Sequence, residues 1–400
     1  MRVLTALAVL LPLGLPLTDA SAGPDPTCSW AAKSEPDTVN VAYPDTNASY
    51  WSHSYSAAPG TELRITGTYA KARYFSFHAY QPTGVPLDSI YDAQIRPDQG
   101  SSNPFAGGRL DAANQRYTLT VSFTAKPAKP AKPRPNTIYA GELAGGNGRN
   151  PGGILMLRVY TPKDARSPQG SVPLPTVTWR TTAGQDLSVG TACSNDLPAA
   201  GGSGTSALNG ASQPDPAPQT TGTEPSWGKA FGNNAAGFFG NQQNAYLTAG
   251  INRANGPLVV IRARAPRFPD TSRGQQPGPS DQVRYWSICQ NSNSTRVNAC
   301  VADYQAAVDK RGYFTFVVSD PAERPVNATA RNGVTWLPWG AADSTGLLIY
   351  RNMAPAASFR QAVQVITKAD DPAKVMGAYY PLARYCTKQS FEQHTWRCSG

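Results

Sequence analysis

The chain has 400 residues and a formal net charge of +10, and it contains 36 glycines, 36 prolines and 18 tyrosines. This length is enough for two or three domains, each able to bury its own core. The many turn formers and aromatic rings favour a β protein and argue against a helical bundle or a disordered chain. Because the basic residues are dispersed or lie among prolines, and do not alternate with aromatic residues on a reading module, nucleic-acid binding is not indicated.

The N-terminus has the pattern of a secretory signal. Arg2 precedes an apolar run that ends near Leu17, and small residues follow up to Ala22. We therefore expect residues 1–22 to be a signal peptide and the mature protein to be secreted, either extracellular or associated with the cell wall. The apolar run is shorter than the roughly 20 residues that span a bilayer, so we predict no stable membrane insertion.

The sequence contains two copies of one module. Residues of the first half recur 211 positions later without a gap. The equivalent pairs at this spacing are Arg73 and Arg284, Tyr74 and Tyr285, Ser76 and Ser287, Asp92 and Asp303, and Asp98 and Asp309. Such a repeat predicts two similar folding units. We assign module 1 to residues 23–193 and module 2 to residues 226–400, joined by a flexible linker, 194–225, that is rich in glycine, serine and alanine.

Short strands dominate both modules. Polar and apolar residues alternate over 63–69 and 117–123, which is typical of half-buried strands, and the more continuous apolar runs 154–160 and 347–350 indicate central strands. We predict an all-β fold with minor helix, a tandem duplicated antiparallel β-sandwich of jelly-roll type.

Short helices are expected only near the C-terminus. Ser358 precedes apolar residues at helical spacing up to Ile366, and Asp371 with the following proline starts a second helix that Gly377 ends. Both helices are predicted to pack over the second sandwich.

The six cysteines of an exported chain are expected to form disulfides, and no zinc-type spacing or cofactor motif occurs. The repeat places Cys289 and Cys300 at the positions of His78 and Ser89, on what we take to be adjacent strands of a hairpin. Proximity then pairs the two cysteines of a C-terminal tail. The predicted disulfides are Cys289 with Cys300, Cys386 with Cys398, and Cys28 with Cys193.

A basic, proline-rich insert occupies residues 126–135. Proline after each lysine prevents a helix and predicts extended polyproline II, with a line of positive charge facing solvent. This insert either aids solubility or attracts an anionic wall polymer or membrane surface.

The segments 284–320, 336–340 and 351–353 resemble those of a family of exported, functionally uncharacterised bacterial proteins that are most common in actinobacteria. The resemblance covers most of both modules and implies a duplicated β-sandwich. It brings no activity, cofactor or catalytic residue. The insert and the linker are not part of the pattern.

Charged residues that both copies share are predicted to be structural. A charged side chain near a core strand is tolerated when it is paired and hydrogen-bonded. We predict an Arg and Asp network inside each sandwich, with a ligand site present twice as the alternative. The residues of this network are Arg73, Asp92, Arg158, Arg284, Asp303 and Arg351.

Candidates for catalysis are weak. Ser76 and His78 share one face of a strand, but residues two apart on a strand lie roughly 6 to 7 Å from each other, too far for a direct hydrogen bond. Asp88 and Asp92 near a hairpin end are the carboxylates that an acid and base mechanism would use.

Aromatic residues suggest binding more than catalysis. Trp51, Tyr80, Trp336 and Trp339 either fill the cores or lie at the surface and stack on sugar rings. We expect a non-catalytic protein that binds carbohydrate or another cell-wall polymer. A secreted hydrolase of polysaccharides or esters and a purely structural envelope protein are the alternatives.

Overall fold

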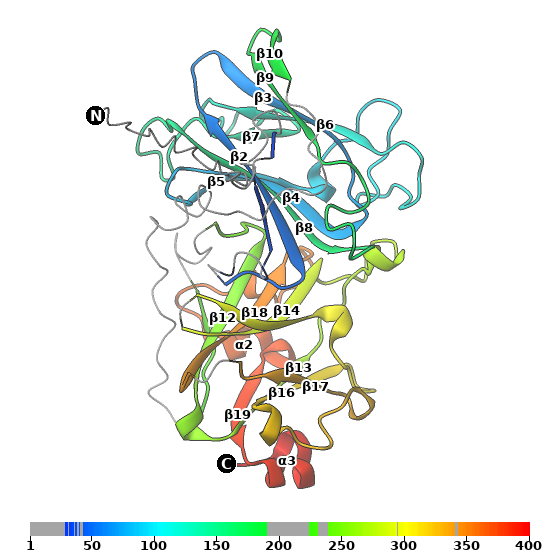
Figure 1. The fold of residues 1–400 in the computed structure, drawn as a ribbon, viewed down its shortest axis with the longest axis vertical. Coiled ribbons are helices and arrows are strands. Elements are labelled where there is room, and N and C mark those ends of the chain that lie inside the picture. The colour runs from blue at the N-terminus through cyan, green and yellow to red at the C-terminus, as the bar shows by residue number, and fades with distance from the viewer. Residues whose placement is uncertain are drawn as a thin grey trace, which may run out of the picture.

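The structure is a computed structural model that describes residues 29–30, 32–35, 37, 40, 43–189, 224–230, 239–293, 295–340 and 343–400. The predicted signal peptide and nearly all of the predicted linker lie outside these residues. Figure 1 shows two β-rich bodies stacked along the long axis, with module 1 above and module 2 below. Within the described part of the chain, no helix is long and apolar enough to cross a membrane.

Module 1 is built from two five-stranded sheets. The first sheet contains, in spatial order, β1 (Ala32–Ser34), β2 (Ala48–Ser56), β8 (Gly152–Pro162), β4 (Ala72–Tyr80) and β5 (Pro86–Tyr91). The second contains β10 (Asp186–Val189), β9 (Thr176–Thr181), β3 (Thr61–Thr68), β6 (Arg116–Ser122) and β7 (Thr137–Tyr139). The chain crosses repeatedly between the two sheets, as it does in a jelly roll.

Module 2 repeats this plan except for β10, which has no counterpart among its described strands. Its first sheet contains β11 (Gly228–Lys229), β12 (Asn244–Asn252), β18 (Thr345–Met353), β14 (Tyr285–Asn291) and β15 (Val297–Ala302). The second contains β17 (Val334–Pro338), β16 (Tyr313–Ser319), β13 (Leu258–Arg264) and β19 (Leu382–Cys386). For β1 to β9, adding ten to a strand number of module 1 gives its counterpart in module 2. The predicted all-β fold of tandem β-sandwiches is therefore confirmed.

The strand registers also repeat. Arg158 on β8 lies between Tyr50 and Ser76 on the neighbouring strands, and Arg351 on β18 lies between the equivalent Tyr246 and Ser287. The long apolar runs form the central strands β8 and β18, as predicted. The sheets are not wholly antiparallel, because β7 pairs with β6, and β17 with β16, in parallel.

Each sandwich has its own core between its two sheets. In module 1, alternate residues such as Leu63, Phe77 and Leu119 are completely buried, and in module 2 Ile261 and Phe316 occupy similar places. The alternation that predicted these strands thus reflects one face turned to the core.

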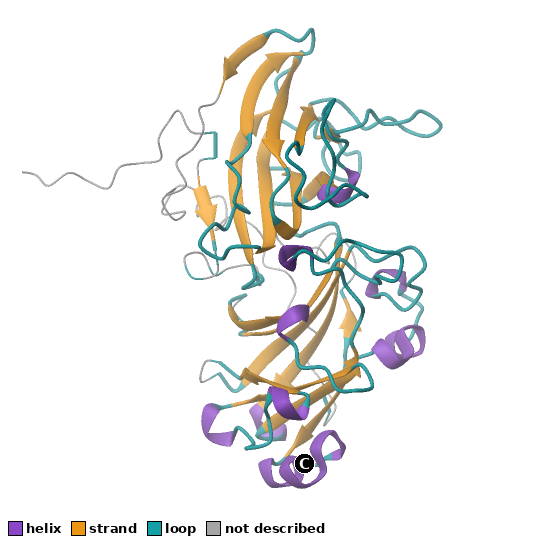
Figure 2. Ribbon diagram, turned by 90° about the vertical axis from the view of Figure 1, so that its right-hand side faces the viewer, coloured by secondary structure: helices purple, strands orange, loops and turns teal. Residues whose placement is uncertain are grey.

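Two α-helices occur in the described residues, and Figure 2 shows most helical segments in and around module 2. The helix α2 (Pro372–Met376) begins after Asp371, whose side chain accepts a hydrogen bond from the Ala373 N–H, and ends at Gly377, as predicted. The helix α3 (Lys388–His394) was not expected. The 3-10 helices are Asp92–Gln94, Arg253–Asn255, Thr271–Arg273, Asp303–Gln305, Pro321–Glu323, Ala330–Asn332, Val363–Val365, Gly377–Tyr379 and Thr395–Arg397.

The helix predicted after Ser358 is wrong. Only a 3-10 turn, Val363–Val365, forms there, although Phe359 and Ile366 are buried in the core as their spacing suggested. The Val363 N–H donates to the side chain of Asn352 on β18, 3.2 Å away, instead of to a preceding helical turn.

The prediction of extended polyproline II for residues 126–135 is also wrong in part. A turn interrupts the insert, with the Ala131 N–H donating to the Ala128 carbonyl at 3.0 Å. Lys126 is bound to Asp88 at 2.7 Å, so its charge is not free. The insert therefore presents separate exposed lysines and not a straight line of charge.

Candidate functional site

The predicted ion network lies at the contact between the modules. Arg73 donates through Nη1 to both carboxylate oxygens of Asp303, each at 2.9 Å. In the same way, Arg284 donates to the two carboxylate oxygens of Asp92, at 2.9 and 3.1 Å. All four residues are buried. The prediction of a separate network inside each sandwich is wrong, because each arginine pairs with the aspartate of the other module.

These carboxylates also serve their own module. Asp92 accepts a hydrogen bond from the Phe75 N–H, and Asp303 from the equivalent Trp286 N–H. Burial raises the pKa of Asp303 to about 7, against the lowering effect of Arg73, and burial raises the pKa of Asp92 as well. Such enclosed pairs connect the modules and offer no open site for a ligand.

Two short segments, which we call straps, cross between the modules. The first strap is residues 43–47 before β2, and the second strap is the equivalent residues 239–243 before β12. The Tyr43 N–H of the first strap donates to the Thr295 carbonyl of module 2, and the Phe239 N–H of the second donates to the Gly84 carbonyl of module 1. Each strap therefore belongs to one module and lies on the other.

The remaining two arginines of the network hold the straps. Arg351 donates through Nη2 to the Tyr43 carbonyl at 2.7 Å, and Arg158 donates to the Phe239 carbonyl and, at 2.7 Å, to the Tyr80 hydroxyl. The straps are not apparent from the sequence pattern. The offset that relates Tyr50 to Tyr246 aligns residues 43–47 with 239–243, but the two segments share no identical residue at this offset.

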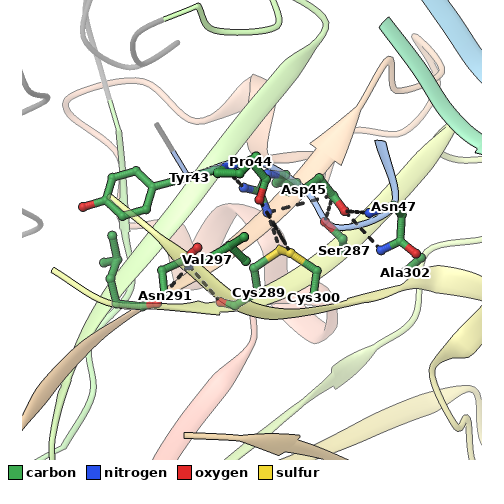
Figure 3. Close-up of a disulfide and its surroundings, with 12 residues drawn as sticks. Tyr43, Pro44, Asp45, Asn47, Ser287, Cys289, Asn291, Val297, Cys300 and Ala302 are labelled. Atoms are coloured by element: carbon green, nitrogen blue, oxygen red, sulfur yellow. Dashed lines mark hydrogen bonds and ion pairs between the residues drawn. A yellow bond between two sulfur atoms is a disulfide. The ribbon is translucent and has the colours of Figure 1, made fainter. Parts of the chain in front are cut away.

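Two of the predicted disulfides are confirmed, Cys289–Cys300 and Cys386–Cys398. Cys28 and Cys193 lie outside the described residues. Figure 3 shows Cys289–Cys300 below the first strap, where Asp45 accepts hydrogen bonds from the hydroxyl groups of Ser287 and Tyr285. Asp45 lies within 4.8 Å of both sulfurs, but these are joined to each other and are not thiolate ligands.

Ser76 and His78 are closer than predicted. The serine Oγ and the histidine Nε2 share a hydrogen bond at 3.0 Å, so the expectation that these side chains are too far apart is wrong. They project from the same face of β4, and the imidazole reaches back along the strand to the short serine side chain. Among the described residues, the histidine Nδ1 has no partner that would orient the ring.

The environment of this pair does not suit catalysis. Both side chains are fully buried against module 2. Burial, followed by the positive charge of Arg158, holds the pKa of His78 well below its usual value. Asp88 is held by Lys126 at 2.7 Å and by the Tyr139 N–H at 2.9 Å, so each predicted catalytic residue has its own structural partners.

The aromatic residues proposed for binding lie mostly in the cores. Trp51, Tyr80 and Trp339 are at most 2% exposed, so an exposed stacking role is wrong for them. Trp336 is half-buried, and its Nε1–H donates to the Ser319 hydroxyl at 3.0 Å. Volume filling, the alternative reading of these rings, fits the structure better.

A polar pocket of about 390 Å³ is lined by residues of β13, β16, β17 and the C-terminal tail. Figure 1 shows β16, β17 and α3 of this tail in the part of module 2 that lies away from module 1. Strands β13 and β16 and the loop before β16 form one side, and the segment before β17 and the C-terminal tail form the other. The lining residues are Arg262, Asp309, Thr315, Asn327, Asn332, Gly333, Val334, Thr395 and Trp396.

The guanidinium of Arg262 is held from several directions. It donates to the Thr315 hydroxyl at 2.6 Å and to the Asp309 carboxylate at 2.5 Å, and it lies 4.9 and 5.0 Å from the ring centroids of Tyr313 and Trp396. Burial favours a higher pKa for Asp309, but the hydrogen bonds from Arg262 and from backbone N–H groups outweigh it and lower the pKa. The pocket therefore keeps a fixed, ionised pair at neutral pH.

Module 1 has part of this arrangement only. By strand register, Thr66 occupies the place of Arg262, while Asp98 and Thr118 are kept and bond to each other at 3.1 Å. The tail after β19, closed by Cys386–Cys398, supplies Thr395 and Trp396, and β9 of module 1 is followed instead by β10. Trp396 was missed in the sequence, where its position between two paired cysteines was the available signal.

No protein-family model and no curated protein sequence matches the chain. Among solved structures, an uncharacterised protein from Burkholderia cenocepacia superposes with a TM-score of 0.50 at 14% identity, covering 90% of this chain and 82% of its own. The VPA0106 protein from Vibrio parahaemolyticus gives a TM-score of 0.43 at 12% identity, covering 86% of this chain and 90% of its own. At 14% identity the first likeness shows the fold alone, and it extends over both modules.

Proposed function

We propose that the chain is an exported, non-catalytic binding protein that holds a carbohydrate or another cell-wall polymer in the pocket of module 2. The observation that carries this proposal is the asymmetry between the copies. In the part of the chain that the structure describes, only module 2 has a tail that closes over Asp309 and Thr315, which both copies share, and that adds an indole ring. Because a duplicated fold needs no such addition for its stability in module 1, the extra elements favour a specialised role.

The chemistry of the lining suits a polyhydroxylated ligand. Hydroxyl, amide and charged groups stand beside the ring of Trp396, and sites of this kind fix the orientation of a ligand through a few polar groups next to an aromatic surface. Export is supported by the signal-like residues 1–22 and by two disulfides, which persist in oxidising compartments.

A secreted hydrolase is the second candidate, favoured by the hydrogen bond between Ser76 and His78. Complete burial of both residues opposes it, since a substrate reaches them only if the structure around them opens. Hydrolysis of generic ester and glycoside substrates that disappears in Ser76→Ala would establish this alternative.

The test of binding uses the full chain, purified with its disulfides intact and mixed with insoluble cell-wall polysaccharide. Trp396→Ala removes the ring from the pocket, and we expect it to weaken binding by about tenfold or more. Trp336→Ala is the matched control, because Trp336 packs against the same cluster but does not line the pocket. Equal binding by wild type and Trp396→Ala, at equal melting temperature, would contradict the proposal.

A further inference from the structure

We propose that the group recognised by Arg262 is an anion, a carboxylate, sulfate or phosphate carried by the polymer. This inference rests on the proposed function and specifies its ligand. Among the described residues, Arg262 uses two of its five N–H groups, one each for Thr315 and Asp309. The other N–H groups remain for a ligand in the pocket that Arg262 lines.

The guanidinium is oriented before a ligand arrives. The rings of Tyr313 and Trp396 limit its rotation, and the two hydrogen bonds fix its plane. A planar, fixed guanidinium matches the geometry of carboxylate, sulfate and phosphate oxygens and forms paired hydrogen bonds with them. Little rotational freedom is then lost on binding, which favours affinity.

The carboxylates near the pocket are already engaged. Asp309 accepts from the N–H groups of Arg311 and Tyr313 as well as from Arg262, and Glu392 accepts from the Val326 N–H at 2.9 Å. A second guanidinium, that of Arg397, lies 5.1 Å from the centroid of Trp396 and is exposed. The positive groups beside the pocket are thus the ones with donors to spare.

The charge of the whole module points the same way. Residues 226–400 contain 19 lysines and arginines and 10 aspartates and glutamates, a net charge of +9, whereas residues 23–193 contain 16 and 12, a net charge of +4. The four basic residues of the insert account for all of the excess in module 1. The larger positive net charge of module 2 attracts a polyanion more strongly than that of module 1.

The experiment compares three polymers with one backbone, namely dextran, carboxymethyl-dextran and dextran sulfate, together with inorganic polyphosphate as the phosphate arm. Arg262→Thr introduces the residue type that module 1 has at the equivalent position, Thr66. Arg262→Lys keeps the positive charge but lacks the planar guanidinium that forms paired hydrogen bonds. Arg264→Thr removes an equal charge two residues along β13 and does not line the pocket. Binding is measured by calorimetry with the full chain at about 50 and 200 mM salt.

We expect the wild type to bind at least one charged polymer more tightly than dextran, and the polymer that binds best identifies the anionic group. Arg262→Thr should weaken that binding by about tenfold to a hundredfold. Arg262→Lys should fall between the two, and Arg264→Thr should stay near the wild type. Circular dichroism and melting temperature verify that each variant is folded. If Arg262→Thr does not fold, the comparison of the wild type with Arg262→Lys tests the inference.

Three results would overturn this inference. Equal affinity of the wild type for dextran and its charged derivatives would show that the pocket does not recognise an anionic group. The proposed function would remain intact, provided that Trp396→Ala still lost binding. Equal losses in Arg262→Thr and Arg264→Thr would show that diffuse charge, and not the guanidinium in the pocket, attracts the polymer. A wild type that binds neither these polymers nor wall polysaccharide would overturn the inference and the proposed function together.

Discussion

At the scale of single residues, the contact between the modules encloses several polar and charged side chains. His78, Ser76 and Arg158 are all buried there, and the same positions in module 2 hold Cys289, Ser287 and Arg351. A buried imidazole without a carboxylate partner is stable in its neutral form, since burial penalises the charged form. This has a measurable effect on the dependence of stability on pH.

His78→Gln is expected to reduce the loss of stability in acid. The pKa of His78 in the folded protein lies well below the ordinary value of 6.5, because of burial and then Arg158. Below about pH 6.5 the unfolded chain therefore binds a proton that the folded chain does not, and the free energy of unfolding falls as the pH falls. In His78→Gln this contribution is absent, so the drop in melting temperature between about pH 7 and pH 5 should be smaller.

The matched control is His394→Gln, because His394 is exposed at the end of α3. Its melting temperature should follow the wild type at every pH. Other groups that titrate in this range, such as Asp303, are common to all three proteins and cancel in the comparison. Parallel curves for wild type and His78→Gln would mean that the buried imidazole does not contribute to acid sensitivity.

At the scale of elements, the C-terminal tail distinguishes the described residues of module 2 from those of module 1. Its sequence runs through α3 and the turn Thr395–Arg397, and the Cys386–Cys398 disulfide returns it to the end of β19. The tail contributes Phe391 to a small buried cluster and Trp396 to the pocket wall. The disulfide should therefore matter both for stability and for the shape of the pocket.

Replacing Cys386 and Cys398 by alanine should reduce the free energy of unfolding by about 3 kcal/mol, the value for a loop of this length. It should also weaken polymer binding, because Trp396 is no longer held against Arg262. Replacing Cys289 and Cys300 by alanine is the comparison, since that disulfide lies at the module contact and should affect stability without affecting the pocket. Chemical denaturation and the binding assay separate the two effects. Equal binding by both double variants would show that the tail keeps its place without its disulfide.

The elements differ in how far the sequence predicts them. Strands such as β3 and β6 follow from alternation, because one face is turned to the core along their whole length. The α2 helix follows from its cap at Asp371. The apolar residues from Phe359 to Ile366 have helical spacing and are buried, yet the Asn352 side chain binds a backbone N–H among them. A tertiary contact of this kind is not visible in a local pattern.

At the scale of the whole molecule, the repeat in the sequence predicts equivalent positions but not partners. Arg73 has the same relation to Asp92 and to Asp303 in the pattern, because each aspartate is the copy of the other. Only the packing of one sheet face against its copy selects the partner in the other module. The pocket could not be predicted from the sequence for a related reason, since Arg262 and Trp396 are 134 residues apart and no repeat connects them.

The reciprocal pairs predict strong energetic coupling between the modules. Arg73→Ala leaves the buried Asp303 carboxylate without its partner, which should cost about 3 to 5 kcal/mol of unfolding free energy. Adding Asp303→Asn should recover part of this loss, because the uncompensated charge is then gone. In a double-mutant cycle the coupling of Arg73 with Asp303 should exceed that of Arg73 with Asp92. Arg109→Ala breaks an exposed pair with Asp111 and should change nothing measurable.

The same cycle decides how the halves of the molecule are joined. If each sandwich kept its own pair, Arg73 would couple to Asp92, and calorimetry of Arg73→Ala would show the melting of module 1 alone. With pairs that cross, a defect on either side weakens both modules, because Arg73 and Arg284 each hold a carboxylate that also accepts a backbone N–H from a strand of the opposite module. We therefore expect a single calorimetric transition in the wild type and one that shifts as a whole in Arg73→Ala. Two separated transitions in the wild type would contradict this coupling.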